Sequence, residues 1–323
     1  MKSLTELSEL ILQSVNNLQF PQNPSGLYDP VRYMLSLGGK RMRPILTLMA
    51  CDAFKGDVNA AIPPALGVEV FHNFTLLHDD IMDNAPLRRS KPTVHEKWNS
   101  NIAILAGDAM FVEACQLVMN APTKSVKEVM QVFTKTALEV CEGQQYDMDF
   151  ESMDQVTIDQ YIDMIRLKTA VLLGASLKMG ALVADASLSD ANHLYDFGVN
   201  LGIAFQLQDD ILDVYGDADH FGKQVGGDIL ANKKTYLLIT ALEKAQGEIK
   251  SELLNWISSN DKSDNKVNAV TEIYNKLNVR QLAEEKMQEL YQDALLHLDA
   301  IPIADSSKQP LKDLADSLMN RKN

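Results

Sequence analysis

Two groups of aspartates in the sequence have the spacing of a metal-binding site. The first lies in the segment 71–89, FHNFTLLHDDIMDNAPLRR, where Asp79 and Asp83 are four residues apart. Side chains four apart on an α-helix lie one above the other, so these carboxylates would share a face. Two such carboxylates repel each other, and burying both requires a cation or a proton between them. The pattern indicates either a hard-metal site or a solvated turn of helix.

The same pattern recurs in the segment 205–217, FQLQDDILDVYGD, as Asp209, Asp210 and Asp213. On a helical wheel, Gln206 shares their stripe at offsets of three, four and seven residues. Oxygen-only ligand sets, without His or Cys, favour Mg²⁺ or Mn²⁺, and Mg²⁺ completes its shell with substrate phosphates. The repetition favours a metal site over a solvated surface, with a phosphate or diphosphate as the ligand.

Basic residues that can bind a diphosphate lie in or beside the predicted helix breaks. They occur in GGKRMRP (38–44), at Arg88 and Arg89, in RLKTA (166–170) and in FGKQVGGDILANKK (221–234). Arginine binds phosphate oxygens through two parallel hydrogen bonds, whereas lysine acts as a point charge. Any one of these residues alone would be read as an ordinary surface residue. Their occurrence together with the aspartates favours two diphosphate sites.

Composition narrows the class of protein. A formal charge of −14 over 323 residues argues against a general nucleic-acid surface, which needs an excess of Lys and Arg. The three cysteines, Cys51, Cys115 and Cys141, are far apart and form no CxxC motif, which fits a reducing cytoplasm. The N-terminal segment reads as an amphipathic helix rather than a signal peptide, and no uncharged apolar run reaches the roughly 18–20 residues of a membrane span. We therefore expect a soluble cytoplasmic protein without a transmembrane segment.

Apolar residues recur at intervals of three and four along almost the whole chain, which is the helical period. Segments rich in Gly, Pro, Asn, Asp and Ser break this pattern at 20–26, 84–93, 215–228, 258–266 and 300–310. No convincing strand and no flexible linker is evident. The sequence predicts a single all-α domain over 1–323, a large helical bundle of ten or more helices with a central apolar cavity.

On these motifs the sequence resembles the trans-isoprenyl diphosphate synthases, or polyprenyl synthetases. Two DDxxD motifs in this order, with RR after the first and GK…GxD…NK after the second, form a specific signature that runs from GGKRMRP to past Lys234. The resemblance implies a bundle of the isoprenoid synthase type and a homodimer. It also implies Mg²⁺-dependent condensation of isopentenyl diphosphate with dimethylallyl, geranyl or farnesyl diphosphate. Three Mg²⁺ ions per site are expected, with Mn²⁺ as a substitute.

The resemblance also assigns roles to individual residues. The metal ligands match Asp79, Asp83 and Asp209, with Asp80, Asp210 and Asp213 supporting them. Contacts to the allylic diphosphate match Arg88, Lys168, Thr169, Gln206, Lys223 and Lys233. Contacts to isopentenyl diphosphate match Gly39, Lys40, Arg43, His72 and Arg89. The expected catalytic set is Asp79, Asp83, Arg88, Lys168, Asp209 and Lys223.

Product length is expected to depend on the residues one or two turns before Asp79. By resemblance, a bulky residue five positions before this aspartate limits products to short chains, and Phe74 holds that position, with Phe71 and Thr75 completing the floor. Thr75 is smaller than the second aromatic of many animal-type farnesyl synthases, and the first motif lacks the insertion of typical bacterial ones. This pattern favours the C20 product, geranylgeranyl diphosphate, over C15. The alternative is that Phe71 and Phe74 merely pack between helices.

Two other functions fit part of the pattern. A class I terpene cyclase also ionises a diphosphate with a DDxxD helix, but it needs neither the GGKRMRP segment nor a second DDxxD. A non-catalytic subunit that binds a partner synthase would typically lose aspartates or the GK and RR groups, and here all are present. Both readings are therefore less favoured than a prenyltransferase.

Overall fold

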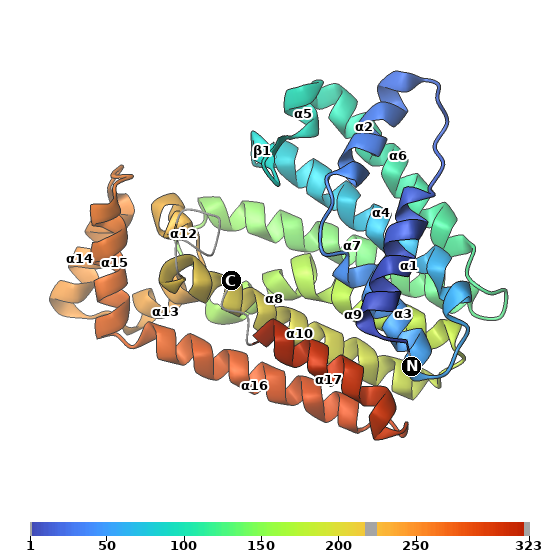
Figure 1. The fold of residues 1–323 in the computed structure, drawn as a ribbon. Helices are drawn as coiled ribbons and strands as arrows, with labels where there is room; N and C mark the ends of the chain where they lie inside the picture. The colour runs from blue at the N-terminus through green and yellow to red at the C-terminus, as the bar shows by residue number, and fades with distance from the viewer. Residues whose placement is uncertain (1, 217–224, 320–323) are drawn as a thin grey trace. The chain divides into compact units, whose positions relative to one another are not determined.

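The computed structural model describes residues 2–216 and 225–319 and is built almost entirely of α-helices (Figure 1). This confirms the predicted all-α class. The chain forms two compact units. Four helices contribute residues to both of them: α7 (Val126–Ser152), α9 (Val171–Val183), α10 (Leu188–Tyr215) and α17 (Asp305–Met319). The single domain over 1–323 stays a prediction.

The first unit comprises Met1–Thr136, Ala175–Tyr195 and Ile301–Pro310. The helices wholly within it are α1 (Leu4–Asn16), α2 (Ser25–Ser36), α3 (Met42–Ala53), α4 (Val58–Met82), α5 (Val94–Lys97) and α6 (Ser100–Met119). Helices α3 and α6 both pack against α4. Helix α3 is buried along most of its length, and Gly180 of α9 lies so close to it that a Cβ atom would come within 2.0 Å of the Thr47 carbonyl oxygen.

Helix α4 carries the first group of aspartates at its C-terminal end. The helix begins after Asp57, whose side chain accepts a hydrogen bond from the Asn59 backbone N–H at 2.9 Å. Such a cap satisfies one of the N–H groups that a helix start leaves without a partner. Most of the next five turns are buried, because α4 is the central helix against which its neighbours pack. The buried body of the helix thus fixes the position of its polar end.

The predicted break at 84–93 contains two strands that the sequence analysis did not foresee. Strand β1 (Leu87–Arg88) pairs antiparallel with β2 (Lys91–Pro92), with Leu87 opposite Pro92 and Arg88 opposite Lys91. Two-residue strands are too short to show the alternating pattern from which strands are predicted. The tight hairpin turns the chain back immediately after the aspartates, so Arg88 and Arg89 stay near the end of α4.

The second unit comprises Ala137–Gly174, Asp196–Ala300 and Leu311–Asn323. Its further elements are α8 (Ile158–Ile165), η1 (Arg166–Ala170), α12 (Gly227–Ala231), α13 (Tyr236–Lys244), α14 (Gly247–Ser258), α15 (Asp264–Lys276) and α16 (Val279–Asp299). Segment η1 is π-helical and joins α8 to α9 without a break. Helix α10 carries the second group of aspartates, and α12 follows it in the chain.

Helix α6 is, among the described helices, the one long and apolar enough to cross a membrane, with a mean hydropathy of 1.7. It also carries Asp108 and Glu113, packs along α4, and has 33% of its most apolar window buried within the protein. Its exposed face nevertheless includes four large apolar side chains: Ile104, Leu105, Val112 and Met119.

Candidate active site

The carboxylates of the first DDxxD motif lie on the last turn of α4. The Asp83 backbone N–H donates to the Asp79 carbonyl at 2.9 Å, so the two residues lie one helical turn apart, as the spacing predicts. Asp79 is half-buried and Asp83 is exposed. Acidic side chains are disfavoured at this end of a helix, because the helix dipole is negative there. A local preference broken in this way is expected where function requires it.

Asp80, between these two residues, is held by the arginine pair that follows. It is 2% exposed, and Arg88 Nε donates to its Oδ1 at 2.9 Å and to its Oδ2 at 2.8 Å. A terminal nitrogen of the same guanidinium lies 2.7 Å from Oδ1. The two residues that were predicted as a supporting carboxylate and a diphosphate contact therefore bind each other.

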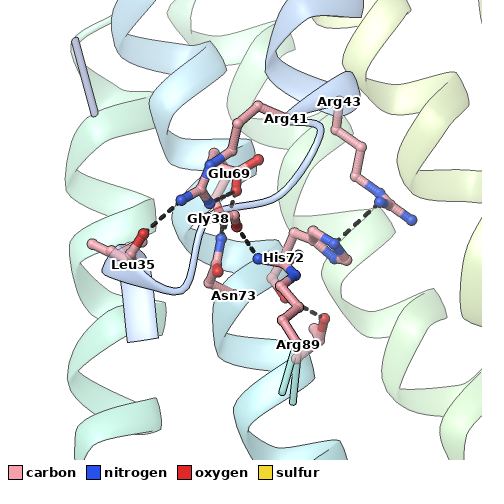
Figure 2. A network of polar contacts seen from close by, with 9 residues as sticks. Leu35, Gly38, Arg41, Arg43, Glu69, His72, Asn73 and Arg89 are labelled. Carbon is pink, nitrogen blue, oxygen red and sulfur yellow. Dashed lines mark hydrogen bonds and ion pairs between the residues drawn. The ribbon is translucent and has the colours of Figure 1, made fainter. Parts of the chain in front are cut away.

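Four of the five residues predicted to contact isopentenyl diphosphate come together in the first unit, and three of them, Arg43, His72 and Arg89, are labelled in Figure 2. Arg43 on α3 lies with its Nη1 3.2 Å from His72 Nε2 on α4. Arg89 donates from Nη1 to the Gly38 carbonyl, and its guanidinium occupies the space that a Cβ atom on Gly39 would need, at 2.6–2.8 Å. The fifth residue, Lys40, is exposed on the same loop. The types of residue suggested these five as substrate contacts, but the sequence alone could not predict how their side chains are arranged.

The electrostatics of this cluster keep His72 neutral. Burial lowers the pKa of His72 well below its usual value, and the nearby charges of Arg43, Arg89, Arg88 and Arg41 lower it further. Burial also lowers the pKa of Arg43, to about 10, so its guanidinium stays charged at neutral pH. A neutral His72 can therefore accept a hydrogen bond from Arg43 at Nε2.

Arg43 retains unused donor capacity. Its Nε is buried and has no hydrogen-bond partner, although buried donors are almost always paired. An arginine can engage an anion through several of its five N–H groups at once. The orphaned Nε of a charged guanidinium therefore points to an anionic ligand in this cluster.

Three further residues belong to the cluster and were missed by the sequence analysis. Arg41 forms an ion pair with Glu69, and Asn73 Nδ2 donates to Glu69 Oε1 at 2.6 Å (Figure 2). One signal was available in the sequence, because Glu69 is the one charged residue between Val58 and His78. A lone acid in an otherwise uncharged helix requires a buried cationic partner.

In the second unit, the second DDxxD motif lies near the end of α10. Asp210 is buried and accepts a hydrogen bond from the Tyr161 hydroxyl of α8, while Gln206 Nε2 lies 3.4 Å from its Oδ1. Burial raises the pKa of Asp210 to about 7, with Asp228 raising it further and Tyr161 opposing the rise. Asp209 and Asp213 are half-buried. The Asp210 carboxylate is thus bound by two side chains of the protein, and its supporting role at a metal site stays a prediction.

Asp213 orders the chain that follows the second motif. Its carboxylate accepts from the Asp228 backbone N–H at 3.0 Å, and its carbonyl accepts from the Gly226 N–H at 2.6 Å. The Lys233 N–H in turn donates to the Asp228 carbonyl at 2.9 Å. The predicted contact Lys223 lies outside the described residues. The Lys233 backbone is thus linked through Asp228 to the carboxylate of Asp213.

Lys168 and Thr169 lie in the π-helical segment η1. Lys168 Nζ lies 2.5 Å from Asp147 Oδ2 on α7, and both side chains are mostly buried. Gly143 lies directly against this turn, because a Cβ atom there would come within 2.3 Å of the Lys168 backbone nitrogen. Single π-helical turns are frequent at functional sites. Asp147, to which the sequence assigned no firm role, is the partner of a predicted diphosphate contact.

Two of the three predicted floor residues, Phe71 and Phe74, belong to an aromatic cluster in the first unit, and Thr75 is the half-buried residue that follows Phe74 on α4. Phe71 is 1% exposed, and its ring packs against Phe74, Phe111 and Phe133 at centroid distances of 5.6, 6.0 and 5.4 Å. Phe74, which is half-buried, also contacts Phe111 at 5.5 Å and His78 at 4.8 Å. Sequence reasoning missed Phe111 and Phe133, because their contacts join different helices.

The donor chemistry fits a hard divalent cation. Throughout residues 2–216 and 225–319, no three carboxylate, histidine or cysteine side chains gather closely enough to form an ion site by themselves. Mg²⁺ is commonly held by one or two carboxylates and completed by water and substrate phosphates. The Asp79 and Asp83 pair, with oxygen donors one turn apart, meets that requirement.

Comparison with known proteins decides the family. The family model described as polyprenyl synthetase matches residues 24–276. The chain belongs to the polyprenyl synthetase family. This confirms the resemblance and the predicted prenyl-transferring enzyme, and it does not favour a terpene cyclase.

Relatives of known type cover most of the chain. A short chain isoprenyl diphosphate synthase of Methanocaldococcus jannaschii is 39% identical over 282 residues, covering 84% of this chain and 86% of that one. A geranylfarnesyl diphosphate synthase of Natronomonas pharaonis is 33% identical and covers 99% and 97%. A crystal structure of a geranylgeranyl pyrophosphate synthase has a TM-score of 0.95 and 43% identity, with complete coverage of both chains.

Proposed function

We propose that this polyprenyl synthetase condenses isopentenyl diphosphate with an allylic diphosphate to give a short all-trans prenyl diphosphate, with C20 favoured over C15. The observation that carries this proposal is the cluster around Arg43, whose buried Nε has no partner. Two arginines, one lysine and a neutral histidine suit a diphosphate head that needs no metal ion. Isopentenyl diphosphate is that substrate.

The allylic substrate is assigned to the aspartates and the remaining basic residues. Asp79, Asp83 and Asp209 would hold Mg²⁺, three ions per site with Mn²⁺ as a substitute, and the bound ions would supply charge stabilisation for the leaving diphosphate. Lys168, Lys233 and Lys223 add cationic charge around the same group, Thr169 and Gln206 add polar contacts, and Arg88 contributes while bound to Asp80. The half-buried position of Asp79 and the exposed position of Asp83 support their role as ligands.

The reaction follows from where charge develops. As the allylic C–O bond breaks, negative charge builds on the departing diphosphate, and cationic side chains stabilise it. The allylic carbocation is attacked by the double bond of isopentenyl diphosphate, which Arg43, Arg89 and Lys40 hold by its head. A new C–C bond forms, and the proton is lost to the released diphosphate. Apolar side chains exclude water, which would otherwise quench the cation.

We assign the control of product length to the aromatic cluster of Phe71, Phe74, Phe111 and Phe133. Phe74 is bulky and braced by Phe71 and Phe111, which supports a floor that stops elongation. Thr75, beside it, is small, and its hydroxyl donates to the His72 carbonyl at 2.9 Å. A floor with one bulky residue supports C20 over C15. Relatives described as geranylgeranyl and geranylfarnesyl synthases support C20 over C15.

A homodimer and a cytoplasmic location complete the proposal. The exposed apolar side chains of α6 support the dimer, because clustered apolar surface can mark a protein interaction site. Light scattering of the purified protein would give the mass of two chains, and Leu105→Glu with Val112→Glu would reduce it to one. A monomeric wild type would contradict the dimer.

One reaction tests the activity. The purified protein is incubated with isopentenyl diphosphate and dimethylallyl, geranyl or farnesyl diphosphate in turn, with Mg²⁺ or EDTA, and products are identified by mass spectrometry. We expect metal-dependent C20 diphosphate with a smaller share of C15. Asp79→Asn and Asp83→Asn should abolish turnover, whereas Asp293→Asn on the exposed face of α16 should leave it unchanged. Cyclic hydrocarbons formed without isopentenyl diphosphate would indicate a cyclase, and no turnover with any primer would indicate a non-catalytic subunit.

A further inference from the structure

The loop that joins α2 to α3 has an unusual backbone. Gly38 and Gly39 have φ of 81° and 124°, and Arg41, which precedes α3 directly, has φ 50° and ψ 35°. Glycine adopts such angles readily, but an arginine in the left-handed region is uncommon. A non-glycine residue persists there when its surroundings hold it.

The side chain of Arg41 provides that hold. Its Nη1 pairs with Glu69 of α4, and its Nη2 donates to the Leu35 carbonyl at 2.5 Å (Figure 2). Leu35 lies in the last turn of α2, where carbonyl groups lack helical partners and a cation is favoured by the helix dipole. The side chains of Arg41 and Glu69 are only 8% and 3% exposed. One guanidinium therefore ties the start of α3 to the end of α2 and to the middle of α4.

Asn73 fixes the carboxylate of this pair. It lies one turn after Glu69 on α4, and its Nδ2 donates to Glu69 Oε1 at 2.6 Å and to the Glu69 carbonyl at 2.8 Å. Asn73 is fully buried, so the amide has little freedom to leave. Two donors on one carboxylate oxygen restrict the rotamer of Glu69, and with it the position of Arg41.

The other end of the loop is held by Arg89. Its guanidinium donates to the Gly38 carbonyl and lies against Gly39, so the loop is fixed from both sides. Arg41, Arg43 and Arg89 all belong to this network, and its carboxylate is that of Glu69 (Figure 2). Because Glu69 binds Arg41, the charges of Arg43 and Arg89 are left without a carboxylate partner in this network. The excess positive charge is available to an anion.

We propose that Arg41 and Glu69, with Asn73, are positioning residues for the head of isopentenyl diphosphate. They do not touch the substrate. They hold the loop of Gly39 and Lys40 in the conformation that presents it beside Arg43 and Arg89. This inference rests on the proposed function, because it assigns the pair to the isopentenyl site rather than to the allylic one. All of these residues belong to the first unit.

The test separates the two substrates. Glu69→Gln keeps the size of the side chain and removes its charge, and the double variant Arg41→Met with Glu69→Leu replaces a buried ion pair by apolar groups, which proteins often tolerate. We expect KM for isopentenyl diphosphate to rise about tenfold to a hundredfold, because small displacements of positioning groups have effects of this size. KM for geranyl diphosphate and kcat at saturation should stay within about twofold of the wild-type values. A raised KM with unchanged kcat is the result expected when a substitution weakens substrate binding alone. Lys124→Met, which removes an exposed ion pair in the same unit, is the matched control.

A calorimetric titration of isopentenyl diphosphate in EDTA measures the same site without turnover. We expect the wild type to bind it and both variants to bind it more weakly by the same factor as the change in KM. A wild type that neither turns over nor binds would reject the proposed function itself. With an active wild type, an unchanged KM in a folded variant, an equal rise in both KM values, or loss of the helical circular dichroism in both variants would each overturn the positioning role.

Discussion

Arg88 binds both carboxylate oxygens of Asp80, the middle aspartate of the first group. The contacts of 2.7–2.9 Å join a side chain that is 3% exposed to one that is 23% exposed. The pair connects the hairpin after α4 to the last turn of that helix. The hairpin can therefore place Arg89 against the Gly38 loop, because its neighbour Arg88 is anchored.

Because of this pair, we expect substitution of Arg88 to lower the free energy of unfolding more than substitution of Arg89. Arg88→Met leaves Asp80 buried without its cation, and removing one partner of a buried pair costs about 3–5 kcal/mol of stability. Arg89→Met removes one hydrogen bond of a more exposed side chain, worth at most about 2 kcal/mol. Urea unfolding followed by circular dichroism measures both. Equal destabilisation by the two substitutions would show that the ion pair between Arg88 and Asp80 contributes no more to stability than the hydrogen bond of Arg89.

His72 predicts a pH dependence of stability. Burial and the neighbouring arginines lower its pKa in the folded protein, whereas the unfolded chain takes up the proton near pH 6.5. Below that pH the unfolded state binds more protons, so this residue reduces stability as pH falls from about 7 to 5. In His72→Gln that contribution is absent, and the unfolding free energy should decline less over the same range. Parallel pH profiles for the two proteins would contradict the lowered pKa.

The Tyr161 hydroxyl predicts a stability effect in the second unit. Tyr161→Phe removes the donor to the buried Asp210, and an unsatisfied buried polar group costs about 1–3 kcal/mol. Tyr146 of α7 is 45% exposed, so Tyr146→Phe is the matched control and should change stability by less than about 0.5 kcal/mol. Chemical denaturation compares them. The hydrogen bond would be without consequence if both variants unfolded at the wild-type midpoint.

Phe74 predicts a change of product. Phe74→Ala should lengthen the prenyl chain, because it removes the ring that Phe71 and Phe111 brace. Leu296→Ala, at a side chain that is 67% exposed, is the control and should give wild-type products. Mass spectrometry of the diphosphates reads the length directly. An unchanged product in Phe74→Ala would remove this residue from the floor and leave it as a packing residue.

Features that depend on neighbouring residues, such as helix ends and the faces of a helix, could be predicted from the sequence. The helical period and the turn-rich breaks predicted the ends of α14 and α16, since Gly, Pro and Asn act within a few residues. The spacing of Asp79 and Asp83 predicted a shared face, because helix geometry alone determines it. Residue types also predicted the basic segments as diphosphate contacts.

Ion pairs between segments that are far apart in the sequence could not be predicted in this way. Arg41 meets Glu69, and Lys168 meets Asp147, across separations that no local period encodes. The sequence shows that a lone buried Glu69 needs a partner, but several arginines were candidates. The choice depends on how α2, α3 and α4 pack, and packing is decided by many side chains together.

The π-helical turn of η1 adds one residue to a helix that otherwise runs from Ile158 to Val183. One residue corresponds to about 100° of rotation about the helix axis. A helical wheel drawn for the whole segment therefore places the residues on one side of η1 on the wrong face. Deleting one residue from the turn would restore an ordinary α-helix and rotate Tyr161 away from Asp210. The extra residue therefore changes the helical phase between α8 and α9, so that side chains on the two sides of η1 face directions that a regular helix of the same sequence would not give them.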